Sequence, residues 1–196
     1  MSWKSSGTTS CGDLADLRFP SSDEPALLEF RETEVQGIAL QILSALKHVH
    51  ALGYAHRDIK LSNFLLDQSG VKLIDFGCAV RVEDCDPARF SGTPFFAPPE
   101  ILVGDDVSVR NPQKYDVYAF GALLYQLATG DVGRSVLYGG NVFALPSCWR
   151  PETRRPRGWS AKGWKACVGI IKQALAPDPT IRPTVERLLT DKWFTA

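Results

Sequence analysis

Residues 115–130, YDVYAFGALLYQLATG, are apolar on nearly every side of a helix, and they constrain the fold more than any other stretch of the chain. An ordinary surface helix keeps one polar face, so a helix without one must be covered by other elements on all sides. Asp116 near its start and Gly130 at its end are typical boundary residues. The segment therefore predicts a buried central helix.

Length and composition fit a single packed domain. The chain has 196 residues, 44% of them hydrophobic, which is enough for one sizeable core. Lys plus Arg and Asp plus Glu both number 22, so the net charge is zero and no global field favours nucleic acid or a membrane surface. We therefore expect no nucleic-acid and no membrane partner.

The cysteines and the N-terminus bear on the compartment. Five cysteines are present without a CxxC pair, which disfavours zinc, and their odd number argues against a disulfide framework. The polar start has no signal-peptide core, and no later run reaches the roughly 18 apolar residues that span a bilayer. We expect an intracellular, cytoplasmic protein, with the nucleus as the alternative. His48 and His50 are expected on a helix surface rather than as metal ligands.

A long amphipathic helix is predicted in the first third of the chain. Apolar residues recur at helical spacing from Val35 to Val49. Thr33 and Gln36 resemble a capping box at the start of this helix, and Gly53 suits its C-terminal stop.

The rest of the chain predicts two shorter helices and two irregular segments. The helices are expected at about 164–175 and 184–189, because the prolines of APDPTIRP forbid one continuous helix. Residues 1–12, rich in Ser, Thr and Gly, are expected to be a flexible lead-in. Residues 131–160, rich in Gly, Pro and Arg, are expected to be a long surface excursion.

Two short apolar runs predict a β-hairpin. Residues 64–67 and 71–74 are separated by a QSG turn signal. Asn63 before the first run and Asp75 at the end of the second are each six positions from Ser69, so antiparallel pairing brings both to the open end of the hairpin. Carboxylate and amide oxygens are hard ligands that suit Mg²⁺. The hairpin therefore predicts a magnesium site.

The segment HRDIKLSN, residues 56–63, leads into that same end. Asp58 lies five residues before Asn63, and Lys60 is close enough to add a cation. Phosphoryl transfer needs an aspartate that receives a hydroxyl proton, a lysine that neutralises phosphate charge and a pair of magnesium ligands. Taken alone, however, Asp58 or Lys60 is better explained as a cap or a solvated charge.

HRDIKLSN also resembles the catalytic loop of protein kinases, and four further motifs follow it in the order typical of that family. DFG at 75–77 resembles the magnesium-binding motif, and GTPFFAPPE at 92–100 resembles the end of the activation segment. DVYAFG at 116–121 resembles the start of the central helix, and DPTIRPT supplies Arg182. Five motifs in series over residues 56–184 argue strongly against a chance match.

The resemblance implies a role for each polar residue of the loop. Asp58 would be the catalytic base or the group that orients the substrate hydroxyl. Lys60 would contact the transferring phosphate of ATP, and its place two residues after the aspartate is the serine/threonine-kinase form. Asn63 and Asp75 would hold Mg²⁺.

Further positions are implied as parts of the nucleotide site and its support. Leu65 would form the floor of the adenine pocket, and Asp13 would contact the ribose. Thr93 would bridge the activation segment to Asp58 and Lys60.

Five residues are implied as structural supports. Glu100 and Arg182 would form a buried ion pair that fixes the activation segment. Asp116 would accept hydrogen bonds from the backbone of the catalytic loop. His56 and Phe76 would stack, which makes His56 a packed core residue rather than a proton shuttle.

The resemblance covers about residues 11–196 and begins near the hinge of a kinase domain. The Gly-rich loop, the strand lysine and the helix glutamate of the upper lobe have no counterpart before Asp13. We therefore expect a partial kinase domain at 13–196. Its fold should be mainly α, a kinase-like C-terminal lobe built as a helical bundle with a small β-hairpin at the catalytic loop.

Two functions follow from this resemblance. The first is a serine/threonine protein kinase region that transfers the γ-phosphate of ATP to serine and threonine hydroxyls of a protein substrate, with Mg²⁺ as the metal. For residues 1–196 alone we expect weak nucleotide binding and little turnover. The second is a non-catalytic interaction module that docks substrates or regulatory proteins and competes with a full-length kinase. An upstream coding sequence with a glycine-rich loop and a strand lysine would favour the first, and its absence together with no thermal shift on adding Mg·ATP would favour the second.

Smaller features bear on substrates and regulation. Ser62 and Gln126 stand where kinases that prefer arginine-flanked substrates carry glutamates, so we expect no preference for basic substrates. Arg57 is of the type that reads a phosphorylated activation-segment residue, and Ser91 is the nearest candidate for that residue. The arginines at 150–157 fit either acidic or phosphorylated partners or a solvated loop.

Overall fold

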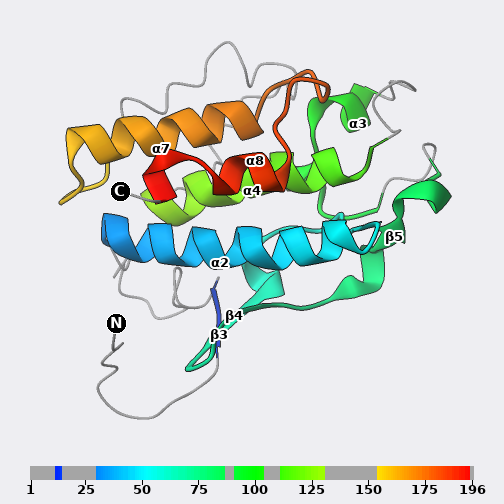
Figure 1. The fold of residues 1–196 in the computed structure, drawn as a ribbon, viewed down its shortest axis with the longest axis horizontal. Coiled ribbons are helices and arrows are strands. Elements are labelled where there is room, and N and C mark those ends of the chain that lie inside the picture. The colour runs from blue at the N-terminus through cyan, green and yellow to red at the C-terminus, as the bar shows by residue number, and fades with distance from the viewer. Residues whose placement is uncertain (1–11, 15–29, 87–90, 104–110, 131–153, 195–196) are drawn as a thin grey trace.

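The fold is a stack of helices flanked by two small antiparallel sheets. The computed structural model describes residues 12–14, 30–86, 91–103, 111–130 and 154–194. In Figure 1, α4 lies between α2 and α7, and α8 packs beside α2. Within the described ranges the helices are α2 (Glu32–Ala51), α3 (Pro99–Val103), α4 (Gln113–Thr129), α7 (Ala161–Ala174) and α8 (Val185–Leu189).

The strands form two separate sheets. The first sheet has the order β1-β3-β4, and the second pairs β2 with β5. In Figure 1, β3 and β4 lie on the side of α2 that faces away from α7. The strands are β1 (Gly12–Asp13), β2 (Tyr54–Ala55), β3 (Phe64–Asp67), β4 (Gly70–Leu73) and β5 (Val80–Arg81). Short 3-10 helices occupy Leu61–Asn63, Phe76–Cys78, Val82–Asp84, Pro94–Phe96 and Lys192–Phe194.

The central helix α4 is buried along almost its whole length, as its sequence predicts. It starts at Gln113, three residues before Asp116, and ends where Gly130 adopts a left-handed φ of 70° and donates its N–H to the Gln126 carbonyl at 2.9 Å. Gly121 lets α7 approach closely, because a Cβ on it would lie only 2.8 Å from the Cβ of Ala174. The apolar surface of α4 is thus covered by its neighbours on all sides.

Helix α2 confirms the predicted apolar face from Val35 to Val49, which is buried against the core. The predicted capping box of Thr33 and Gln36 is wrong, because the helix already begins at Glu32. Glu34 instead accepts the backbone N–H of Arg31 at 2.8 Å, where its charge also favours the helix N-terminus. The Gln36 amide donates to the Trp193 carbonyl at 2.7 Å.

The C-terminal end of α2 leads directly into the strands. The helix ends at Ala51, and Gly53 has a left-handed φ of 79°, so the predicted stop signal is confirmed. Tyr54 and Ala55 then form β2, which pairs with Arg81 and Val80 of β5.

The predicted hairpin is present with a small shift of register. β4 begins at Gly70 and ends at Leu73, one residue earlier at both ends than expected. Leu73 pairs with Phe64, so Asn63 lies opposite Ile74 and Asp75 lies just beyond the ladder. Asp75 leaves the strand because its φ of 60° turns the chain into the following 3-10 helix.

Helix α2 and a third strand hold the hairpin in place. The Gln41 side chain accepts the N–H of Val71 at 2.9 Å, which ties β4 to α2. β1 pairs with β3, with Asp13 opposite Leu65, so Gly12, which was expected to belong to a flexible lead-in, lies in a strand. Residues 1–11 lie outside the described part of the chain.

The C-terminal helices start at side-chain caps. Ser160 caps α7 by accepting the N–H of Gly163 at 2.9 Å, so the helix begins at Ala161 rather than at 164. Thr184 caps α8 in the same way, accepting from Arg187 at 3.3 Å. Most of the predicted excursion at 131–160 lies outside the described residues.

The described end of that excursion is partly core. Trp159 is buried, and its indole N–H donates to the Phe30 carbonyl at 3.0 Å. It also packs against Trp164 and Trp193. This segment was expected at the surface, but an aromatic side chain with a satisfied N–H is more stable inside. None of the described helices combines the length and the apolar character needed to cross a membrane.

Candidate active site

One buried carboxylate fixes the backbone of residues 56–58. Asp116 is fully buried and accepts the N–H of His56 at 2.8 Å and the N–H of Arg57 at 2.7 Å. These two bonds hold Arg57 in a left-handed conformation with φ of 64°, which few non-glycine residues adopt. The predicted role of Asp116 is confirmed, and the central helix thereby sets the shape of the loop.

A histidine that was expected on the surface joins this arrangement. His50 Nε2 lies 2.8 Å from Asp116 Oδ2, the same oxygen that accepts the His56 N–H. The His50 side chain is only 7% exposed. The prediction of a surface role for His50 is therefore wrong, whereas His48 is exposed as expected. The missed signal was spacing, because His50 lies four residues after the buried Leu46 on the same face of α2.

His56 is a packed residue, as predicted. It is fully buried, its Nδ1 accepts the N–H of Asp58 at 3.3 Å, and its Nε2 lies 3.1 Å from the Ile74 carbonyl. Its ring meets Phe76 edge to face at 4.9 Å between centroids. Both ring nitrogens of His56 are thus used structurally, while Phe76 remains 51% exposed.

Both carboxylate oxygens of Asp58 have hydrogen-bond partners. Its Oδ1 accepts the N–H and the hydroxyl of Thr93 at 2.9 and 2.7 Å. Its Oδ2 accepts the Asn63 amide at 3.0 Å and lies 2.8 Å from the Lys60 amine. Burial alone would raise the pKa of Asp58, but the hydrogen bonds from Lys60, Thr93 and Asn63 outweigh burial and lower it. The carboxylate is therefore ionised and fixed in direction at neutral pH.

The contact with Thr93 depends on a close approach of two backbone segments. Gly92 has a φ of 122°, and a Cβ on it would lie 2.2 Å from the carbonyl oxygen of Arg57. Only glycine fits such a conformation and distance. Thr93 also accepts from the Lys60 amine at 3.0 Å, so the predicted bridge from the activation segment to Asp58 and Lys60 is observed.

Asn63 and Asp75 lie at the same end of the hairpin. The Ile74 N–H donates to the Asn63 backbone carbonyl at 2.9 Å, which brings Asp75 next to this end. The Asn63 side-chain N–H groups donate to the Asp58 carbonyl and carboxylate at 2.7 and 3.0 Å, which leaves its amide oxygen as an acceptor. Asp75 is exposed and uses one carboxylate oxygen to accept the Gly77 N–H at 3.2 Å.

This donor set fits Mg²⁺. An amide oxygen and a carboxylate are hard ligands, and Mg²⁺ takes its remaining positions from water and phosphates. Among the described residues no group of three or more His, Cys, Asp or Glu side chains could hold a metal ion, so a site here relies on such external oxygens. Leu65 is half-buried in β3, and the register places Asp13 opposite it.

A buried ion pair supports the activation segment. The two guanidinium nitrogens of Arg182 lie 2.5 and 2.6 Å from the two carboxylate oxygens of Glu100. Arg182 also donates to the carbonyls of Ala176 and Pro177 and lies over the Tyr118 ring, 4.9 Å from its centre. The predicted pair is confirmed, and the carbonyl and ring contacts were not predicted.

Three smaller predictions concern Arg57, Ser91 and Gln126. Arg57 Nε donates to the Cys78 carbonyl at 2.8 Å, and its guanidinium lies near Cys85, whose pKa burial raises. Ser91 is half-buried, and its phosphorylation stays a prediction. Gln126 is buried, and its amide oxygen has no hydrogen-bond partner in the described part of the chain.

Comparisons with known proteins place this geometry in a family. The protein kinase domain model matches residues 11–194. The chain is 32% identical over 174 residues to the serine/threonine-protein kinase PSK2 of Saccharomyces cerevisiae, a match that covers 86% of this chain and 14% of that protein.

Two further relatives match a similar share of this chain at similar identity. The human hormonally up-regulated neu tumor-associated kinase is 30% identical over 169 residues, covering 83% of this chain and 22% of that protein. CBL-interacting protein kinase 25 of Oryza sativa subsp. japonica is 32% identical over 179 residues, covering 84% and 31%. The chain therefore spans less than a third of the length of these three relatives.

Proposed function

This chain belongs to the protein kinase family, and from that premise we propose that it forms the catalytic C-terminal lobe of an enzyme that phosphorylates serine and threonine hydroxyls of proteins. The single observation that carries the proposal is the position of Asp58. Its carboxylate is ionised, is held by Thr93 and Asn63, and lies beside the Lys60 amine.

Each residue of the loop can act on the phosphoryl-transfer step. Asp58 orients the attacking hydroxyl of the substrate and accepts its proton as the bond to phosphorus forms. Its lowered pKa makes orientation the larger part of this role, because a weak base holds a proton poorly. Lys60 balances the charge of the transferring phosphate, and Thr93 holds the side chains of Lys60 and Asp58 in position relative to each other.

Protein kinases use ATP and Mg²⁺, and the residues present suit both. Asn63 and Asp75 would hold the metal through the amide oxygen and the carboxylate. When bound, Mg²⁺ neutralises phosphate charge and holds the phosphates in place. Leu65 would lie under the adenine ring and Asp13 next to the ribose. These assignments rest on the motif positions and on the shared end of the hairpin.

A second candidate function is favoured by the exposure of Phe76. This ring lies next to the site and has 51% of its surface open among the described residues. A lobe with this exposed ring beside Asp75 could bind a protein substrate, a regulatory protein or a full-length kinase without catalysing transfer.

Transfer of labelled γ-phosphate separates the two functions. We expect low but measurable incorporation into a serine/threonine peptide library by the native protein, loss of that incorporation in Asp58→Asn, and no loss in Ser62→Ala, an exposed neighbour on the same loop. Thermal unfolding with Mg·ATP provides the second readout. Equal transfer by the native protein and Asp58→Asn would contradict the assignment, and the absence of both transfer and thermal shift would favour the interaction module.

A further inference from the structure

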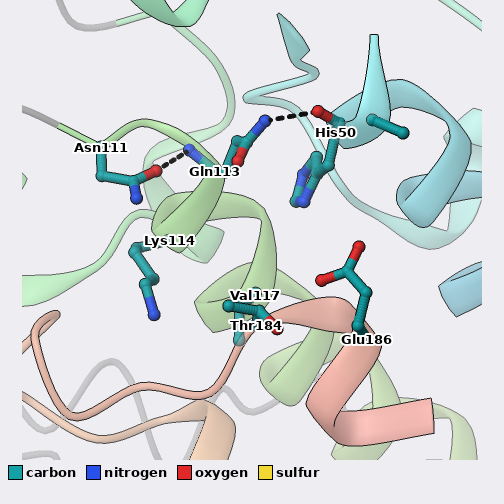
Figure 2. Close-up of a pocket in the computed structure, with 8 residues that line it drawn as sticks. His50, Asn111, Gln113, Lys114, Val117, Thr184 and Glu186 are labelled. Atoms are coloured by element: carbon teal, nitrogen blue, oxygen red, sulfur yellow. Dashed lines mark hydrogen bonds between the residues drawn. The ribbon is translucent and has the colours of Figure 1, made fainter. Parts of the chain in front are cut away.

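A polar cavity lies between the end of α2, the start of α4 and the start of α8. Its volume is about 110 Å³, whereas one water needs roughly 10–15 Å³ by the same measure, so it has room for a molecule of several heavy atoms. Figure 2 shows the side chains that line it; only His50, which contacts Asp116, also belongs to the site described above. They are His50, Ala51, Asn111, Gln113, Lys114, Val117, Thr184 and Glu186.

One side of this cavity carries a cation without a counter-charge. The Lys114 amine is half-buried and donates to the backbone carbonyl of Arg182, and it forms no ion pair with any residue that the structure describes. Burial lowers the pKa of Lys114, and the nearby charge of Arg182 lowers it further. The charge of Arg182 is balanced by Glu100, so the remaining cost is the partial desolvation of the Lys114 ammonium, which an anion entering the cavity would relieve.

The opposite side carries a carboxylate. In Figure 2, Glu186 and Lys114 lie on opposite sides of the cavity, with Thr184 and Val117 between them. Hydrogen bonds from its own backbone N–H and from Thr184, together with the nearby Lys47 charge, lower the pKa of Glu186, so it is ionised at neutral pH. Glu186 is exposed and therefore open to a ligand.

The amides of Asn111 and Gln113 complete the lining above these charges. The side-chain oxygen of Asn111 accepts the backbone N–H of Gln113 at 3.2 Å, which leaves the Asn111 amide N–H groups free to donate. The cavity thus presents a cation, an anion and polar amides around one small apolar surface on Val117.

We propose that this cavity binds a small zwitterion of amino-acid size, with its carboxylate at Lys114 and its ammonium at Glu186. A ligand with one charge would engage only one of these two side chains. The order of charges across the cavity matches a molecule that carries both, and the volume of about 110 Å³ suits a small one.

The cavity is also connected to the catalytic loop. Gln113 Nε2 donates to the carbonyls of His50 and Tyr54 at 3.0 and 3.1 Å, and His50 contacts Asp116. Asp116 in turn fixes the N–H groups of His56 and Arg57. Gln113 is the chain neighbour of Lys114, so a zwitterion that restrains Lys114 also restrains Gln113 and, through His50, the loop conformation. We therefore expect the cavity to be a regulatory site.

Binding is tested on the full chain by NMR, with backbone amide shifts as the readout. The probes are β-alanine, 4-aminobutyrate and 5-aminopentanoate, and butyrate and butylamine are the single-charge controls. We expect saturable shifts at Asn111, Gln113 and Lys114, with a Kd at least tenfold lower for the best zwitterion than for either control. Equal Kd values for a zwitterion and butyrate, or shifts confined to other regions, would overturn the proposal.

Two variants assign the two ends of the ligand. Lys114→Met and Glu186→Gln should each weaken zwitterion binding at least tenfold, while Lys165→Met, an exposed lysine on α7, should leave it unchanged. Circular dichroism checks that Lys114→Met still folds without its bond to Arg182. Glu186→Gln alters only an exposed side chain, so unchanged binding in this variant would by itself refute the assignment.

The connection to the loop has its own readout. Saturating zwitterion should slow hydrogen exchange of the His56 and Arg57 amides at least threefold in the native protein and not in Glu186→Gln. Binding without any change in this exchange would refute the regulatory role. Neither measurement uses ATP, so its outcome is independent of the proposed kinase activity.

Discussion

Thr93 and Asp58 are joined twice, because the N–H and the hydroxyl of Thr93 both donate to the same oxygen of Asp58, at 2.9 and 2.7 Å. The same hydroxyl accepts from Lys60 at 3.0 Å. One side chain of the activation segment therefore determines the direction of the proposed base and the position of the proposed phosphate ligand.

Thr93→Val tests this relationship, because valine keeps the shape of threonine and removes the hydroxyl. A hydrogen bond to a charged group contributes about 1.5–3 kcal/mol, so we expect phosphate transfer to fall about ten- to hundredfold. The fall should appear in kcat more than in the KM for ATP. Thr93→Ser retains the hydroxyl and should keep most of the activity; an equal loss in both variants would contradict the role of the hydroxyl.

The lowered pKa of Asp67 predicts that the stability of the hairpin depends on pH. Hydrogen bonds from Lys72 and Ser69 lower the pKa of Asp67 to about 2. Its pKa in the unfolded chain is about 3.9, so Asp67 contributes stability that is complete above that value and is lost as the pH falls towards 2. An NMR titration of the carboxylate should give a midpoint well below 3.9 in the native protein and a higher one in Lys72→Met.

Because Asp67 lies at the surface, the contribution of Lys72 should shrink in salt. The midpoint of Asp67 should therefore rise when sodium chloride is increased to 1 M, and Asp67→Asn should show a smaller loss of stability between pH 4 and 2. A salt-independent midpoint near 3.9 would show that the hydrogen bonds to Lys72 and Ser69 do not form in solution.

Removing one partner of the buried Glu100–Arg182 ion pair should lower the unfolding free energy strongly. Glu100→Gln leaves the buried guanidinium without a counter-charge, and breaking a buried pair typically costs about 3–5 kcal/mol of unfolding free energy. Urea unfolding measures this cost. The double variant Glu100→Leu with Arg182→Met removes both charges and should be more stable than Glu100→Gln. The opposite order would show that Arg182 stabilises the fold mainly through its bonds to Ala176 and Pro177.

Gly121 and Gly169 form a matched pair of helical glycines. Gly121→Ala places a Cβ 2.8 Å from Ala174 on α7, and such overpacking costs about 1–3 kcal/mol. Gly169 lies on α7 with no atom within 4 Å of an added Cβ, so Gly169→Ala should stabilise the protein by about 0.5–1 kcal/mol. Thermal unfolding of both variants gives the comparison; destabilisation of similar size at both positions would contradict the close approach of α4 and α7.

The sequence carried strong signals for α4 and for the hairpin, because both arise from local patterns. The all-round apolar run of α4 allows only a buried helix, and the turn signal after Asp67 sets the strand pairing to within one residue. The motif order then pointed to Asp116, Glu100 and Arg182 as supports, and their contacts are present.

Features made by distant contacts had no such local signal. The two-residue strand β1 is too short for any periodicity, and it exists because Asp13 and Gly12 pair with β3 more than 50 residues later. The identity of Asp116 as the partner of His50 likewise depends on where the backbone runs in three dimensions, whereas the cap of α2 by Glu34, three residues after Arg31, is a local contact. The cavity at Lys114 forms where three helices meet, so no single stretch of sequence predicts it.

The contact of Gly92 with Arg57 has a consequence for protein engineering. Because this contact joins backbone to backbone, it cannot be adjusted in small steps by exchanging side chains. A transplanted activation segment would bring its own sequence and length, but it would still need a glycine with positive φ at this position. A graft that ignores this requirement would displace the chain at Thr93, however well the rest of the new segment were chosen.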